Sequence, residues 1–155
     1  MNLNIRETIS KEDLIIAEHF CKLWLDIGVP ENFIQSNYRN LTLEFIKEAR
    51  QNLFYKGFVV EVDNLVVGSA SCQLFTGLYP NVLKEGYRKY GYIWGVYVEP
   101  SYRRKGIAKQ LTNAPVEYLK TIGCTKAILN ASPAGKSVYE SLGFSLTNAM
   151  ELDLI

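Results

Sequence analysis

Runs of alternating apolar and polar residues mark the predicted β-strands of this chain. Leu3 and Ile5 alternate with polar neighbours at the start, which is the pattern of a strand with one buried face. Asp63-Asn64 separates two later apolar runs and predicts a hairpin turn between them. Pro100 ends another strand because proline has no N–H group to donate to a sheet. The predicted strands span residues 3–8, 58–62, 65–74, 92–98, 127–130 and 150–154.

Apolar residues spaced three and four apart predict the helices. Ser10 with Asp13 resembles a capping box and predicts the start of the first helix, and Thr42 is the predicted cap of the second. Pro115 lies inside the third helix and predicts a kink, because it removes one backbone hydrogen bond. The three predicted apolar faces are Ile16, Phe20, Leu23, Trp24 and Ile27; Leu43, Ile46, Ala49 and Leu53; and Ile107, Leu111, Ala114, Tyr118 and Ile122.

The order of these elements predicts an α/β (α+β) fold built on a mixed sheet. Strand, two helices, three strands, helix, strand, short helix (136–142, with Gly143 as its cap) and final strand follow one another, so helices are expected to cover the sheet. The length of 155 residues suits a single domain over 1–155. Residues 75–90 interrupt the strand order as an irregular insertion, and long loops of this kind are often binding loops.

Composition and charge exclude several classes of partner. The chain has 17 Lys+Arg and 16 Asp+Glu, for a net charge of +1, so no overall field favours nucleic acid or an anionic membrane. The three cysteines lie in apolar runs without a Cys-x-x-Cys spacing, and no apolar signal segment opens the chain, so we expect a cytoplasmic protein. His19 is the only histidine and is expected to be solvated or partly packed, so no metal site is expected.

The segment from Val96 to Ala108 carries the strongest chemical signal. A strand ends at Pro100, a run of three cations (Arg103–Lys105) follows, and Gly106 then leads into a helix. The first amides of a helix have no backbone partner, and the helix dipole is positive at that end. Gly106 lets an anion approach the backbone closely. The segment therefore predicts a site for a phosphate or pyrophosphate group.

Two blocks of sequence match a known family. Arg103-x-x-Gly106-x-Ala108 resembles the acetyl-CoA pyrophosphate loop of the GNAT superfamily of N-acetyltransferases. Tyr139-Glu140-Ser141-Leu142-Gly143-Phe144 is similar to the same superfamily's second motif, at the expected distance downstream. The resemblance implies a mostly antiparallel mixed sheet with helices on both faces, and transfer of an acetyl group from acetyl-CoA to an amine. The bland alternative for the first block is a basic turn that caps a core helix.

The resemblance also assigns roles to individual residues. The backbone of Val96 and Val98 would hold the pantetheine arm, the amides from Arg104 to Lys109 would bind the pyrophosphate, and Tyr139 would be the acid that protonates the leaving thiolate. Gly95 would form a bulge that splays the strand from its neighbour. Ser132 stands where the family usually has a pantetheine-binding Asn, and Asn130 is the other candidate. The implied cofactor-binding set is Val96, Val98, Arg103, Arg104, Lys105, Gly106, Ile107, Ala108, Lys109, Asn130 and Ser132.

Several questions stay open at this stage. The general base is unassigned, with Glu61, Glu85 and Glu99 as candidates beside a chain of water molecules. The acceptor is an amine of a small molecule or peptide, and residues 79–90 with 29–40 are expected to shape its pocket. The polar face formed by Ser69, Ser71 and Gln73 either lines a cleft or is a solvated sheet face. A homodimer is an open possibility for the assembly.

Two other functions compete with the acetyltransferase. A non-catalytic acyl-CoA-binding sensor or regulatory module would use the same loop, but Tyr139 favours the enzyme. A nucleotide-binding module would also use an anion loop at a helix start. The chain lacks a Walker lysine pattern, however, and it lacks an acidic residue at the distance that ribose recognition needs.

Overall fold

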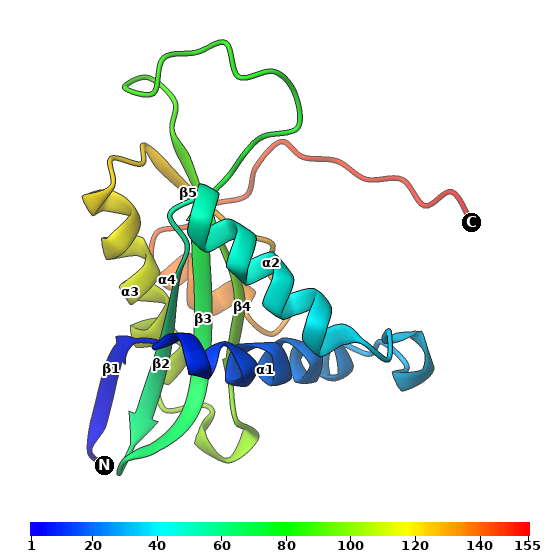
Figure 1. Ribbon diagram of the computed structural model, residues 1–155, viewed down its shortest axis with the longest axis vertical. Coiled ribbons are helices and arrows are strands. Elements are labelled where there is room, and N and C mark those ends of the chain that lie inside the picture. The colour runs from blue at the N-terminus through cyan, green and yellow to red at the C-terminus, as the bar shows by residue number, and fades with distance from the viewer.

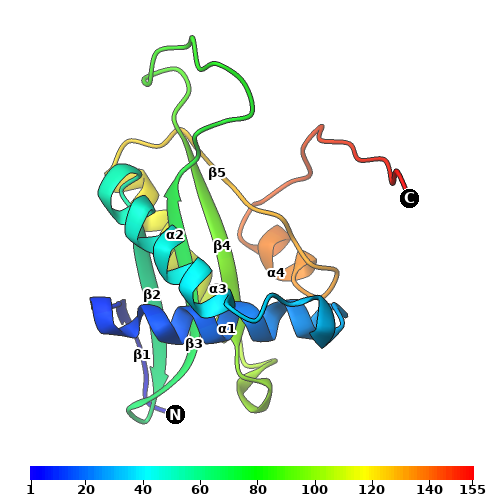
Figure 2. The ribbon, with the colours of Figure 1, turned by 45° about the vertical axis from the view of Figure 1, so that its right-hand side comes forward.

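The computed structural model describes all of residues 1–155. It contains a five-stranded sheet with helices on both faces (Figures 1 and 2). The sheet order is β1-β2-β3-β4-β5, antiparallel except for the parallel pair β4/β5. The strands are β1 (Leu3–Glu7), β2 (Lys56–Val62), β3 (Leu65–Leu74), β4 (Tyr90–Val98) and β5 (Lys126–Ile128). The helices are α1 (Asp13–Asp26), α2 (Tyr38–Asn52), α3 (Ile107–Thr121) and α4 (Lys136–Ser141). The predicted fold class is confirmed.

The face of the sheet under α3 is packed with apolar side chains. Val60 and Ala70 meet Ile107 and Leu111 there, and all of them are buried. The buried face of α3 continues through Pro115 and Leu119. The predicted face continued through Ala114, Tyr118 and Ile122 instead, and these three residues are only half-buried. Proline packs well at this position because its ring is apolar.

The opposite face, under α1 and α2, carries buried polar side chains that are paired one to one. Ser69 lies 2.7 Å from Nδ1 of His19, and Ser71 lies 2.9 Å from the hydroxyl of Tyr55. Gln73 accepts a hydrogen bond of 2.6 Å from Nε1 of Trp94. Ser69 and Ser71 thus lie in neither a cleft nor a solvated face. They are polar because the side chains above them are polar.

His19 is buried, so the expectation of a solvated or partly packed histidine is wrong. Its side chain is only 5% exposed, and burial lowers the pKa of the imidazole. The prediction failed because the burial of His19 depends on how α1 packs across β3. The local sequence around His19, including the charged Glu18 beside it, does not contain this information.

Local turn chemistry explains the hairpin between β2 and β3. Asp63 and Asn64 have φ angles of 50° and 68°, which Asn and Asp adopt more readily than other residues with side chains. The predicted turn is therefore confirmed. The predicted helix starts are wrong. Ser10 lies in a short 3-10 helix (Ser10–Glu12), and the amide of Ile9, the residue before it, donates to the carboxylate of Glu12 at 3.0 Å. Thr42 lies inside α2.

The predicted last strand does not form. Residues after Phe144 have no regular structure, and they run out from the molecule as the red segment of Figure 1. Met150, Leu152 and Leu154 alternate with charged residues, but their side chains are almost fully exposed. Alternation gives a segment the character of a strand, whereas a strand forms only where another strand supplies hydrogen-bond partners. None of the helices has the length and apolar character that crossing a membrane requires.

Candidate active site

A gap between β4 and β5 creates the candidate site. The two strands pair only from Tyr90 to Tyr92, so the rest of β4 has no strand partner on that side. Gly95 has a φ of 67° and lies at a break in the register between β3 and β4. A bulge of this kind bends the strand and strengthens its local twist. The expected bulge is therefore present, and it lies where the strands separate.

A cavity of about 690 Å³ occupies this gap. Its floor is residues 92–96 of β4 with Gln73 of β3, and one wall is residues 129–133 with Tyr139 of α4. The opposite wall comes from α1 and α2. That wall consists of Phe20, Leu23, Trp24, Ile27, Leu41, Thr42 and Phe45. The predicted apolar face of α1 is thus only partly a core face, because its second half lines the cavity.

The loop before α3 presents unpaired amides, as the anion site requires. After the amide of Arg103, which donates to the carbonyl of Pro100 at 3.2 Å, no backbone amide donates a hydrogen bond until that of Gln110, which donates to the carbonyl of Gly106 at 3.3 Å. The amides of residues 104–109 are therefore free. Gly106 has a φ of 76° and Arg104 a φ of 61°. A Cβ atom at Gly106 would meet nothing within 4 Å, so the glycine is needed for its backbone conformation and for open space.

The side chains of this loop differ in how they contact the rest of the protein. Nε of Arg103 donates to the carbonyl of Val98 at 2.7 Å, and its Nη2 pairs with Asp26 at 2.6 Å, so its guanidinium holds the loop against α1. Ile107 is buried in the core and offers only its amide. The remaining cations, Arg104, Lys105 and Lys109, are exposed and form no ion pair with the protein.

The two valines predicted to hold pantetheine differ in their surroundings. Val96 lines the cavity in the unpaired part of β4. Val98 is buried and lies outside the cavity lining, and its carbonyl already accepts from Arg103.

Tyr139 reaches the cavity from the short helix α4. Its ring packs edge-on against Phe144, with 6.0 Å between the ring centroids, and Gly135 leaves room for it. Its hydroxyl bonds to no other protein group, so it can donate to a bound molecule. Burial raises the pKa of the phenol above its usual value near 10, which keeps it protonated at neutral pH.

Asn130 and Ser132 both line the same wall of the cavity. Nδ2 of Asn130 donates to the hydroxyl of Tyr92 at 2.7 Å, which fixes its amide and leaves its oxygen free. Oγ of Ser132 accepts from the amide of Gly135 at 3.2 Å at the start of α4. Sequence position therefore identified two cavity residues, although it did not show that Ser132 also supports the turn before α4.

None of the three carboxylates considered as a base lies in the cavity lining. Glu61 pairs with Arg6, Glu85 with Lys89, and Glu99 with Lys22. Tyr92 and Tyr139 are the only ionisable residues that line the cavity. The cavity lining therefore offers two phenols and neither a carboxylate nor an imidazole.

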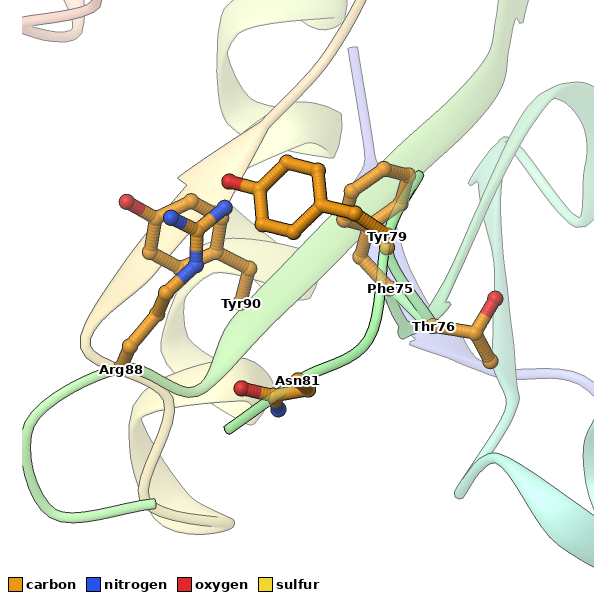
Figure 3. A pocket seen from close by; sticks show the side chains of 7 residues that line it. Phe75, Thr76, Tyr79, Asn81, Arg88 and Tyr90 are labelled. Atoms are coloured by element: carbon orange, nitrogen blue, oxygen red, sulfur yellow. The ribbon is translucent and has the colours of Figure 1, made fainter. Parts of the chain in front are cut away.

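The insertion between β3 and β4 does not line the large cavity, contrary to expectation. It rises above the sheet in Figure 1 and encloses a separate hollow of about 20 Å³. Figure 3 shows Arg88 between two tyrosines there, 5.4 Å from the ring centroid of Tyr79 and 4.2 Å from that of Tyr90. Residues 29–40 are also absent from the lining of the large cavity, to which the aromatic residues of α1 and α2 contribute instead.

Comparison with known proteins agrees with this geometry. The model of the acetyltransferase (GNAT) family matches residues 17–144. Glucosamine 6-phosphate N-acetyltransferase of Trypanosoma brucei brucei is 36% identical over 106 residues, which cover 68% of this chain and 69% of that protein.

Solved structures share the fold over almost the whole chain. A predicted acetyltransferase from Clostridium acetobutylicum, solved with acetyl-CoA, is 27% identical with a TM-score of 0.81, over 99% of this chain and 97% of that one. A GCN5-related N-acetyltransferase from Ralstonia eutropha gives the same TM-score at 22% identity, over 99% of both chains, which shows the fold alone. The chain therefore belongs to the acetyltransferase (GNAT) family and is an N-acetyltransferase.

Proposed function

We propose that the enzyme transfers the acetyl group of acetyl-CoA to an amine by direct attack of the amine on the thioester. The observation that carries the proposal is the arrangement around β4. The unpaired amides before α3 and the strand gap offer places for the pyrophosphate and the pantetheine arm. Tyr139, with a free hydroxyl, lines the cavity that the gap opens. The structure solved with acetyl-CoA supports the same ligand.

The pyrophosphate would lie on the amides of Arg104, Lys105, Gly106, Ile107, Ala108 and Lys109. Unpaired amides at a helix start bind anions because their N–H groups donate hydrogen bonds and the positive end of the helix dipole attracts the negative charge. Val96 would pair with the pantetheine arm in place of a missing strand, with the amide of Val98 and the side chains of Asn130 and Ser132 as further donors or acceptors. Arg103 acts by holding the loop in place.

The chemistry proceeds in one attack and one departure. The neutral amine attacks the thioester carbonyl carbon, and the C–S bond breaks as the tetrahedral intermediate collapses. Tyr139 donates its proton to the departing sulfur, the amine loses a proton to water, and water restores the phenol. Because the same apolar surroundings raise the pKa of the phenol and of the leaving thiol, the two groups stay close enough in acidity for proton transfer.

Two measurements test this function together. Calorimetry with acetyl-CoA measures cofactor binding, and release of CoA thiol in the presence of a broad panel of amines measures transfer. We expect saturable binding and amine-dependent thiol release, with one acetylated amine formed per thiol. Binding without turnover on the panel would contradict the enzyme and favour a sensor of acyl-CoA. The cytoplasmic location and the homodimer remain predictions.

A further inference from the structure

We infer that the acceptor of this enzyme is a primary amine on an apolar or aromatic body, without a phosphate or other anionic group. This inference rests on the proposed function and names its second substrate. It comes from the wall that α1 and α2 build together with the side chain of Trp94, because the opposite wall and the backbone of β4 are assigned to acetyl-CoA. We call this surface the aromatic wall; it consists of Phe20, Trp24, Ile27, Leu41, Phe45 and Trp94.

The aromatic wall exposes apolar surface that the protein itself does not cover. Trp24, Ile27, Leu41 and Phe45 are between 42% and 51% exposed, although they lie on, or directly after, helices packed beside the sheet. Large apolar side chains that gather around a concave surface commonly mark a binding site. An apolar body of the acceptor would bury this surface.

Trp94 is the centre of the aromatic wall. Phe20 and Phe45 both meet its ring edge-on, with centroid separations of 5.0 Å and 5.5 Å. Gln73 fixes the indole through the hydrogen bond from Nε1. A fixed set of aromatic rings favours another ring or an apolar body that packs against it.

No charged side chain lines the cavity at all. Three cations of the neighbouring helices are already paired with carboxylates of the same chain: Lys22 with Glu99, Arg39 with Glu18 and Arg50 with Asp13. The remaining cation of these helices, Lys47, does not line the cavity. A sugar phosphate would bring a dianion into this apolar space, and a buried anion without a cationic partner is strongly unfavourable. The related enzyme from Trypanosoma brucei brucei is named for glucosamine 6-phosphate, so the inference predicts a different acceptor here.

The apolar wall also accounts for the lack of a base. Moving an ammonium group from water into apolar surroundings lowers its pKa, which favours the neutral amine that attacks the thioester. A water molecule can then take the proton without a carboxylate in the cavity. An acceptor with an apolar body suits the chemistry as well as the shape of the site.

The test compares 2-phenylethylamine with glucosamine 6-phosphate in the thiol-release assay at saturating acetyl-CoA. We expect kcat/KM to be at least about 100-fold higher for 2-phenylethylamine, which is the scale of discrimination that an apolar pocket gives. Equal or better use of glucosamine 6-phosphate would overturn the inference and leave the proposed function standing. The same conclusion would follow if the enzyme bound acetyl-CoA and acetylated other amines of the panel but neither amine of this pair. Failure to bind acetyl-CoA would overturn both.

Two variants and a matched control locate the effect. Phe45→Ala should raise KM for 2-phenylethylamine about 10-fold and leave KM for acetyl-CoA unchanged. Phe33→Ala removes an equally large but 74% exposed ring outside the cavity and should change neither constant. Lys136→Gln removes an exposed cation from α4, the helix that carries Tyr139, and should also have no effect on amine turnover. A large loss with Lys136→Gln, or none with Phe45→Ala in a protein of unchanged melting temperature, would contradict the inference.

Discussion

The loop before α3 and the aromatic wall are the two ends of the proposed site, and they are built from different materials. At the α3 end, residues 104–109 offer unpaired amides, and Arg104, Lys105 and Lys109 are exposed cations without an ion pair. At the α1/α2 end, the aromatic wall offers apolar surface, and no charged side chain lines the cavity. The sheet between the two ends contributes the bulge at Gly95, which lines the same cavity as Tyr139. The difference teaches that one end is suited to an anionic cofactor and the other to an uncharged apolar amine.

The largest expected effect comes from Gly106→Glu at the α3 end. The substitution places a side chain in the open space of the loop, forces a residue with a Cβ into a φ of 76°, and adds a negative charge beside the pyrophosphate. We expect binding of acetyl-CoA to fall below detection by calorimetry, with the fold retained because nothing packs there. Unchanged affinity in a folded variant would remove the loop from the site.

Tyr139→Phe tests the chemistry between the two ends. The variant keeps the ring against Phe144 and removes only the proton donor, so we expect turnover to fall about 100-fold, the scale of general acid catalysis. Affinity for acetyl-CoA and melting temperature should hardly change.

Tyr139→Ala provides the matched comparison for this prediction. Loss of the partly buried ring should lower the free energy of unfolding by about 2 kcal/mol, because it leaves a space in the packing. Wild-type turnover of the Phe variant at saturating substrate would rule out the acid role. A purely structural tyrosine would show its effect only in the Ala variant.

The pH dependence of kcat/KM should follow the amine rather than a protein base. Burial raises the pKa of Tyr139 above 10, so the phenol stays protonated below that pH and its acid form is lost only above it. No histidine or carboxylate lines the cavity. Hence kcat/KM should rise steadily from pH 6 to 9 as the neutral amine becomes more abundant. An inflection between pH 4 and 7 would indicate a carboxylate or imidazole base.

Sequence predicted the backbone geometry at the α3 end of the proposed site far better than the residues that line the α1/α2 end. The loop at Gly106 and the bulge at Gly95 depend on backbone conformations that glycine favours, and such residues can be seen in a sequence. The hairpin at Asp63-Asn64 was predicted for the same local reason.

Features that depend on tertiary packing were missed. His19 is buried because its helix crosses Ser69, and Phe45 joins the cavity because α2 lies beside α1, contacts that no local pattern contains. The insertion at residues 75–89 drew attention by its aromatic and basic residues, which pair with one another in a small hollow away from the site. The alternation of Met150 and Leu152 resembled a strand, but no strand lies beside it.

The separation of the two ends is tested most directly by crossing two mild variants with two substrates. Arg104→Ala removes an exposed cation from the loop, and Phe45→Ala removes a ring from the aromatic wall. With steady-state KM measured for acetyl-CoA and for 2-phenylethylamine, we predict that Arg104→Ala raises only the first, about threefold, since one exposed charge contributes about 0.7 kcal/mol. Phe45→Ala should raise only the second. A variant that raises the KM for acetyl-CoA and the KM for 2-phenylethylamine equally, with an unchanged melting temperature, would contradict this division of the site between cofactor and acceptor.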